Sequence, residues 1–446
     1  MKRFLSTFAG LRMFFIVWST QNLSILGSSM TSFALVIWSY QQKGSALTTA
    51  LLSVCSYAPY VLLSIFAGTL GDRWDKRRTM AVCDSLAGLT TVAVLFLLRT
   101  GRLEIWHLYV LNALGGLMST IQNPVSEVFV TLLTPKEQVQ RVSGLLSLSG
   151  SLVSLLSPVF ATAVLTLLGM EAVIAFDLLT CAAAVGTMVF AVRLPEAPAP
   201  AERPSPLRSA AEGLGWLAAN RGVLDLILFL AAINLIASMY NAALPAMLLS
   251  RPGGGEAVLG LVETVTGLAN LAGSLLAAAL PAPKSRVRVI CNCLLVSMST
   301  ENLLLALGRG PGVWCLGAVL GWTLIPVMNT NMNALLRLRI PVEMQGRVYA
   351  ARNTLQFFTI PVGYLLGGWL VDRVCAPLMA AQGPDAPLTR LLGSDGGGGA
   401  ALAVNGMLRP IMEEKGVHIG FAIGGIMQAM CELMDAGLVR KIVDAQ

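Results

Sequence analysis

The chain has 446 residues, of which 55% are hydrophobic and 12% are charged, and its formal net charge is +7. A soluble domain carries about 25% charged residues, so this composition excludes an ordinary soluble protein and indicates a chain that crosses a membrane several times. The Lys and Arg residues lie in short segments beside apolar runs, where membrane orientation accounts for them and nucleic-acid binding is not needed.

The eight cysteines lie mostly within apolar runs and lack the spacing of metal-ligand motifs. Cysteines of this kind usually behave as small buried apolar residues. We therefore expect no metal site and no cofactor.

Six apolar segments in the first half of the chain each approach the ~20 residues that a membrane span requires. They cover about residues 13–38, 46–70, 79–98, 105–130, 143–168 and 172–192. The first follows a basic N-terminus and is too long for a signal-peptide core, so we expect it to be retained as a helix.

A break follows the sixth span, where five prolines precede a stretch with amphipathic spacing. Apolar side chains recur there at helical intervals, which predicts a helix on the cytoplasmic membrane surface. These side chains are Leu207, Ala211, Leu214 and Leu217. We interpret this break as a linker between the two halves of the chain.

The second half contains five more apolar segments, at about residues 222–249, 258–280, 289–307, 313–335 and 353–372. We divide the chain into a first transmembrane half, a cytoplasmic linker, a second transmembrane half and an atypical tail, at residues 1–192, 193–221, 222–378 and 379–446. The predicted outside loops up to the tenth span hold only five of the Lys and Arg residues. This bias predicts a multi-pass protein of the cell membrane with a cytoplasmic N-terminus.

The stretch from Gly68 to Met80 is a short charged hairpin between the second and third spans. It resembles the signature loop of the major facilitator superfamily, Gly-x-Leu-x-Asp-Arg-x-Gly-Arg-Lys, with Asp75 where the second glycine usually stands. Further matches, over residues 10 to about 378, resemble the macrolide-efflux-like branch of drug and proton antiporters. They are Asn123-Pro124, Thr134-Pro135-Lys136-Glu137, Ser157-Pro158, Phe176-Asp177, Gly346-Arg347-Val348 and the segment from Pro361 to Arg373.

The resemblance implies an all-α membrane protein with the major facilitator fold, built from two six-helix halves. It also implies that the hairpin is a conformational latch, in which Asp72 contacts the start of the eleventh helix in one state only. The latch residues are Gly68, Gly71, Asp72, Arg73, Lys76 and Arg77. The plainer interpretation is a set of solvated charges that orient the chain in the membrane.

The fifth span matches the antiporter motif of the resembled family in part. Gly144 and Pro158 fit the motif, whereas Ser157 and other residues replace its remaining glycines. Small residues there permit close helix packing, and Pro158 supplies a kink. The match suggests antiport.

Proton coupling needs a carboxyl group that exchanges its proton as its access to water changes. Glu301 is the first candidate because no basic residue shares its span, and Glu263 is the second. For Asp177, a structural hydrogen bond is the plainer interpretation. Asp84 lies one turn into the third span, where we expect a salt bridge to Arg77 or Arg78.

Polar residues in the first and seventh spans are candidates for a central cavity or for contacts between helices. Gln21, Asn22 and Asn241 are the main ones. No arginine lies mid-span, so an amphipathic or hydrophobic substrate fits better than a sugar phosphate or a dicarboxylate.

The tail departs from the resembled family, because the apolar run after residue 391 is shorter than the ~18 residues of a span. A twelfth helix is therefore doubtful or missing. Residues 404–446 resemble a segment of the citrate lyase alpha subunit, with no catalytic residue set, so we expect no enzyme. The tail is interpreted as a chimeric or mis-assembled reading frame, with a divergent twelfth helix as the alternative.

The sequence thus predicts a secondary transporter, a monomer in the bilayer, that exports amphipathic small molecules of the drug or macrolide type in exchange for protons. One alternative is a transport-inactive or sensor-like membrane protein, owing to the altered tail. A narrower alternative is a lipid or metabolite transporter.

Overall fold

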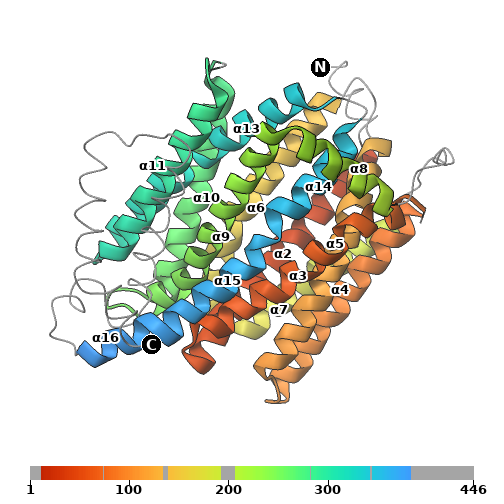
Figure 1. Ribbon diagram of the computed structural model, residues 1–446. Helices are drawn as coiled ribbons and strands as arrows, with labels where there is room; N and C mark the ends of the chain where they lie inside the picture. Colours follow the sequence, from red (N-terminus) through yellow and green to blue (C-terminus); the bar gives the residue numbers. More distant parts are fainter. Residues whose placement is uncertain are drawn as a thin grey trace, which may run out of the picture.

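A computed structural model of the chain describes residues 12–73, 75–133, 139–191, 206–281, 283–341 and 344–382, and these form helices and turns without a strand among them. Ten described segments are long and apolar enough to cross a membrane. The long helices run roughly along one direction and form a single bundle (Figure 1).

Each of the six apolar segments of the first half is a helix. They are α2 (Arg12–Lys43), α3 (Ala46–Arg73), α4 (Lys76–Arg99), α5 (Ile105–Leu133), α6 (Val139–Leu168) and α7 (Met170–Gly186), which runs on into a short π-helix, η2 (Thr187–Ala191). α5 is not among the ten apolar segments, and it packs against both α3 and α4. We call the end of the bundle where α2 begins the upper end, and the end where α3 begins the lower end.

The second half begins with three unbroken helices and continues with shorter ones. The helices are α9 (Arg221–Ser250), α10 (Glu256–Ala279), α11 (Arg286–Leu307), α12 (Pro311–Trp322), α13 (Ile325–Arg339), α14 (Gln345–Phe357), α15 (Thr359–Trp369), the π-helix η4 (Leu370–Cys375) and α16 (Ala376–Gln382). The tail, residues 383–446, lies outside the described residues, and so does any twelfth helix.

Two predicted spans are interrupted, and a proline accounts for each interruption. Proline has no backbone N–H, so it leaves the carbonyl four residues earlier without its helical partner. Pro326 thus leaves the carbonyl of Trp322 without its helical partner, and α12 ends at Trp322. Pro361 does the same to the carbonyl of Phe357, where α14 ends.

The predicted linker helix is present as α8 (Pro206–Ala219). Leu217 is buried and Gly213 lies against the backbone of Arg347 in α14, whereas Leu214 is 45% exposed. Glu212 of α8 forms an ion pair with Arg347. The described part of α8 is therefore docked on α14, and its expected contact with the membrane surface stays a prediction.

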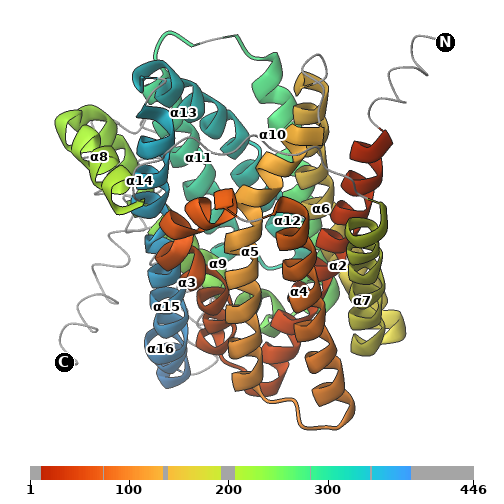
Figure 2. The same cartoon turned by 90° about the vertical axis from the view of Figure 1, so that its right-hand side faces the viewer.

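Helices before and after the linker meet along two lines, α3 against α15 and α6 against α10 (Figure 2). Glycines allow the close approach in both: a Cβ atom on Gly368 would lie 2.6 Å from the Leu47 Cα, and one on Gly267 would lie 2.7 Å from the Leu155 Cα. Backbones that approach this closely gain dispersion contacts, which hold helices together in lipid.

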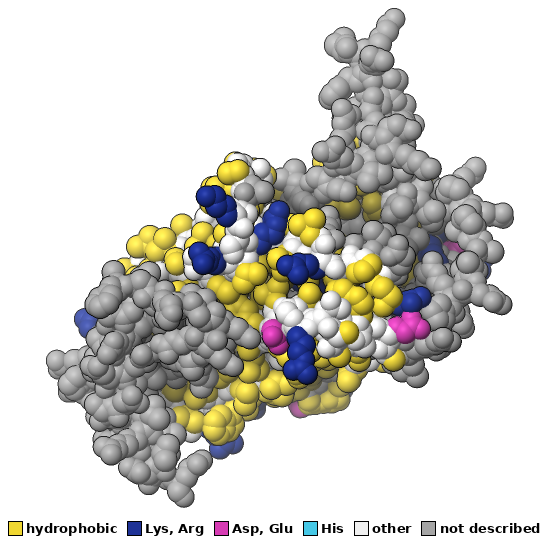
Figure 3. Space-filling view, turned by 45° about the horizontal axis from the view of Figure 1, so that its top comes forward, with side chains coloured by type: hydrophobic (Ala, Val, Ile, Leu, Met, Phe, Trp, Pro, Cys, Tyr) yellow, Lys and Arg dark blue, Asp and Glu magenta, His cyan; other side chains and the backbone are white. Residues whose placement is uncertain are grey.

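Several Lys and Arg side chains lie on the upper end, which Figure 3 turns toward the viewer. Exposed cations at helix ends there are Arg78, Arg221, Lys284, Arg288 and Arg339. Their position matches the charge bias from which the orientation was predicted.

Replacing Gly273 by Val is expected to lower the stability of the bundle by about 1–3 kcal/mol, because overpacking forces the helix backbone to move. A Cβ atom there would lie 2.8 Å from the Thr323 carbonyl carbon. Thermal unfolding in detergent measures the effect, with Gly115→Val as the control, since no heavy atom lies within 4 Å of that position. Equal unfolding temperatures for the two variants would contradict this account.

Candidate functional site

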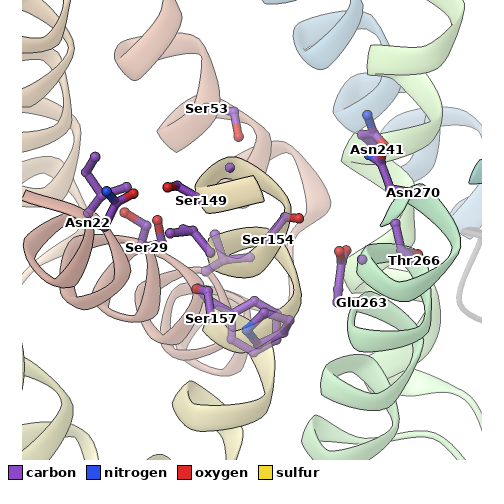
Figure 4. A pocket seen from close by; sticks show the side chains of 18 of the residues that line it. Asn22, Ser29, Ser53, Ser149, Ser154, Ser157, Asn241, Glu263, Thr266 and Asn270 are labelled. Atoms are coloured by element: carbon purple, nitrogen blue, oxygen red, sulfur yellow. The ribbon is translucent and has the colours of Figure 1, made fainter. Parts of the chain in front are cut away.

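A cavity of about 830 Å³ lies between helices of the two halves of the chain. Its lining is mostly apolar and aromatic, with small polar side chains set into it. In Figure 4 the labelled polar side chains stand on two facing walls, one containing Asn22 and Ser157 and the other containing Glu263 and Asn270. Large, mostly apolar cavities with few polar groups are typical of small-molecule sites.

The first wall is formed chiefly by α2 and α6. Gln21 and Asn22 of α2 line it, and the Asn22 amide donates to the Trp18 carbonyl at 2.6 Å. Ser157 and Pro158 of α6 also line it, and both are largely buried. Gly144 lies further toward the start of α6, and its surroundings are outside the described residues.

The second wall is formed chiefly by α9 and α10. Glu263, Thr266 and Asn270 are spaced by three and four residues, so they share one face of α10. Asn241 of α9 lies beside them in Figure 4. Among the described lining residues, Glu263 is the one with a charged side chain.

Glu301 lies behind this wall and does not line the cavity. It is 7% exposed, and one of its carboxyl oxygens accepts a hydrogen bond of 3.0 Å from the indole N–H of Trp322, which does line the cavity. Gly321 leaves room for the carboxyl group, because a Cβ atom there would lie 2.6 Å from the Glu301 Cδ. The Trp322 side chain thus lies between Glu301 and the cavity.

The hydroxyl of Tyr240 completes this group. It is buried beside Glu301 and within electrostatic range of Glu263. Two carboxyl groups, a hydroxyl and an indole N–H from four helices therefore meet without a cation among their described partners. Such a group has the chemistry to accept, hold and release a proton.

Asp84 is satisfied by neutral amides, so the expected salt bridge is wrong. Its two carboxyl oxygens accept from the side-chain amides of Gln21 at 2.8 Å and Gln122 at 2.6 Å. Arg77 instead donates to the carbonyls of Met188, at 2.7 Å, and Val189 at the end of η2. A cation at the carboxyl end of a helix satisfies carbonyls that lack a helical partner.

Asp177 is separate from the cavity lining and from the Glu301 group. It is 2% exposed, and its two oxygens accept from the hydroxyls of Ser28 at 2.9 Å and Thr91 at 3.2 Å. It therefore joins α7 to α2 and α4 through structural hydrogen bonds, which is the plainer interpretation given to it from the sequence.

The proposed latch is described only in part. Gly68, Gly71, Asp72 and Arg73 lie in the last turns of α3, and their side-chain contacts are outside the described residues. Lys76 and Arg77 begin α4. The side chain of Asp75 accepts from the Arg78 N–H at 2.7 Å and so caps this helix, which gives a physical reason for an aspartate in place of the usual glycine.

Sequence reasoning missed Trp322, Thr266 and Asn270. The three-and-four spacing from Glu263 to Asn270 was a usable signal for the last two, since it puts them on one helix face. Trp322 carried no comparable signal, because its role depends on a neighbouring helix.

Two family descriptions match the chain. "Major Facilitator Superfamily" matches residues 17–364. "Citrate lyase, alpha subunit (CitF)" matches residues 392–446, in the part of the tail outside the described residues.

Three individual proteins illustrate these matches. Macrolide efflux protein A of Streptococcus pyogenes is 24% identical over 369 residues, which is 81% of this chain and 90% of that protein. A crystal structure of the nucleoside transporter NupG is similar with a TM-score of 0.64 at 11% identity, over 89% of this chain and 99% of that one. The citrate lyase alpha chain of Haemophilus influenzae is 39% identical over 77 residues, which is 17% of this chain and 15% of that protein.

Replacing Asp84 by Asn is expected to lower stability by about 1–3 kcal/mol, because an amide N–H₂ would then face the donor group of one of the two glutamines. Thermal unfolding in detergent measures this, with Asp225→Asn on the exposed face of α9 as the control. If the two variants unfold at the same temperature, the Asp84 hydrogen bonds contribute nothing to the fold.

Proposed function

Because this chain belongs to the major facilitator superfamily, and so is a membrane transporter, we propose that it exports amphipathic small molecules in exchange for protons. The observation that carries the proposal is the cavity, with one carboxylate on its wall and a second carboxyl group behind Trp322. With the upper end in the cytoplasm, as the charge bias favours, an inward proton gradient would drive the exchanged molecule outward.

The substrate class is argued from the cavity lining. Twelve Ser, Asn and Thr residues are set among the aromatic and apolar side chains of the lining, and no Lys or Arg is among the described lining residues. An anion such as a sugar phosphate would need a cation there, whereas a molecule with an apolar body and a few polar groups would not. The similarity to a macrolide efflux protein supports a cargo of this kind.

Alternating access accounts for the position of the cavity. Transporters built from two repeated halves bind their substrate between the halves and rock one half against the other. The α3–α15 and α6–α10 contacts are the surfaces that such a motion would use. In this scheme the hairpin at Gly68 to Arg77 would stabilise one of the two states.

Proton coupling is assigned to Glu301 with Glu263 as its neighbour. A substrate in the cavity would contact Trp322, and moving that indole would remove the hydrogen-bond donor of Glu301. Loss of a donor changes how tightly a carboxyl group holds its proton. Filling the cavity would in this way be linked to protonation of Glu301. Tyr240 interacts with both Glu301 and Glu263.

A second candidate is a membrane protein that binds without transporting, and the altered tail, where a citrate lyase match stands in place of a clear twelfth helix, is the observation behind it. We infer no enzymatic activity from the match, because it covers 15% of the lyase chain. Flux of an amphipathic compound in proteoliposomes separates the two candidates: transport no faster than in empty vesicles supports the second.

Glu301→Gln is expected to abolish the dependence of efflux on a pH gradient while leaving substrate binding within about twofold, because Gln keeps the shape but carries no exchangeable acidic proton. The measurement is flux of an amphipathic fluorescent compound in proteoliposomes with and without a pH gradient. Gradient-driven flux equal to that of the unmodified protein rules the role of Glu301 out.

The matched control is Glu104→Gln. Glu104 also accepts a hydrogen bond from a tryptophan, at 2.8 Å from the Trp106 indole, but it is exposed and lies away from the cavity lining. Its variant should keep full gradient-driven flux.

A further inference from the structure

Asp372 contacts the start of a helix from the other half of the chain. It lies in η4, which continues α15, and its two carboxyl oxygens accept from the backbone N–H groups of Ala46 at 3.0 Å and Leu47 at 2.9 Å. The hydroxyl of Ser45 donates to it at 2.5 Å. All three donors belong to the first turn of α3 or precede it directly.

The contact satisfies groups that α3 cannot satisfy by itself. The first N–H groups of a helix have no helical acceptor, and they carry the positive end of the helix dipole. The Ser45 hydroxyl accepts a hydrogen bond from the Thr48 N–H at 3.1 Å, and the Asp372 carboxylate accepts from the N–H groups of Ala46 and Leu47. The start of α3 is therefore capped jointly by its own serine and by a carboxylate from the second half.

Two more contacts join the halves at the same lower end. The Gln41 side chain, near the end of α2, donates to Glu256 at the start of α10. Gly368, one turn before Asp372, lies against Leu47. In this structure the lower end is thus tied across the halves by side-chain and backbone contacts.

We infer that Asp372 is a gating residue of transport, whose carboxylate holds the lower end closed and releases it once in each cycle. Alternating access requires the halves to part at this end, and the Asp372 contacts with α3 cannot survive that parting. Water then replaces the lost partners on both sides, so the contact is strong enough to bias the equilibrium and weak enough to reverse. The inference needs alternating access and does not depend on proton coupling or on the cargo.

The test measures how readily the cavity is reached from the lower end. A single cysteine at Ser29, which lines the cavity, is introduced into a chain whose native cysteines are replaced, and a membrane-impermeant maleimide is applied from that side. Asp372→Ala should speed labelling about 2- to 30-fold, the range expected for loss of helix-capping contacts. An unchanged labelling rate overturns the inference.

Glu171→Gln is the matched control. Glu171 lies at the same end and pairs with Arg99 at 2.9 Å, but both residues belong to the first half. Its variant should label at the rate of the parent chain. Acceleration as large as in Asp372→Ala would mean that any lost charge at this end has the effect, which also overturns the inference.

A disulfide gives a reading that does not depend on how well Asp372→Ala folds. Ser45→Cys with Asp372→Cys should cross-link on oxidation, because their side chains touch across the two halves. Oxidation should stop labelling at position 29 from the lower side, and a reductant should restore it. Equal labelling in the oxidised and reduced chains contradicts a gate at this contact.

Discussion

A polar group buried in this bundle has to find its partner within the protein, because hydrocarbon supplies none. Asp84 and Asp177 meet this constraint with amides and hydroxyls from neighbouring helices, and no described Lys or Arg is among these hydrogen-bond partners. These bonds fix α2 relative to α4, α5 and α7. The cavity depends on them, since α2 forms much of its first wall.

Polar contacts in the structure fall into two physical kinds. Those of Asp84 and Asp177 join helices of the same half and stay buried if the half moves as a unit. Those of Asp372 and Gln41 join different halves at the lower end, where water can replace them. A transporter needs both kinds, because each half must stay intact while the surface between the halves opens and closes.

Glu301 is held by fewer fixed hydrogen-bond donors than Asp84 and Asp177 are. Trp322 donates to one carboxyl oxygen of Glu301, and the Tyr240 hydroxyl lies beside the carboxyl group. A carboxyl group with few fixed donors depends more on its surroundings for its charge than one held by two amides. This contrast singles out Glu301 and Glu263 among the buried acids of the described residues.

The sequence by itself determined the helical class, the position of each long helix and the apolar nature of the site. Spans of about 20 apolar residues have one stable form in a bilayer, so length and composition suffice for them. It also picked out Glu263, Gln21, Asn22 and Asn241, because a polar residue within a span must face the bundle. The tertiary structure alone decided which helices meet: Asp84 with Gln122, Trp322 between Glu301 and the cavity, and Asp372 on the first turn of α3. These pairings lie 38, 21 and more than 320 residues apart, and the spacing of residues within one helix carries no information about which residue of another helix it will touch.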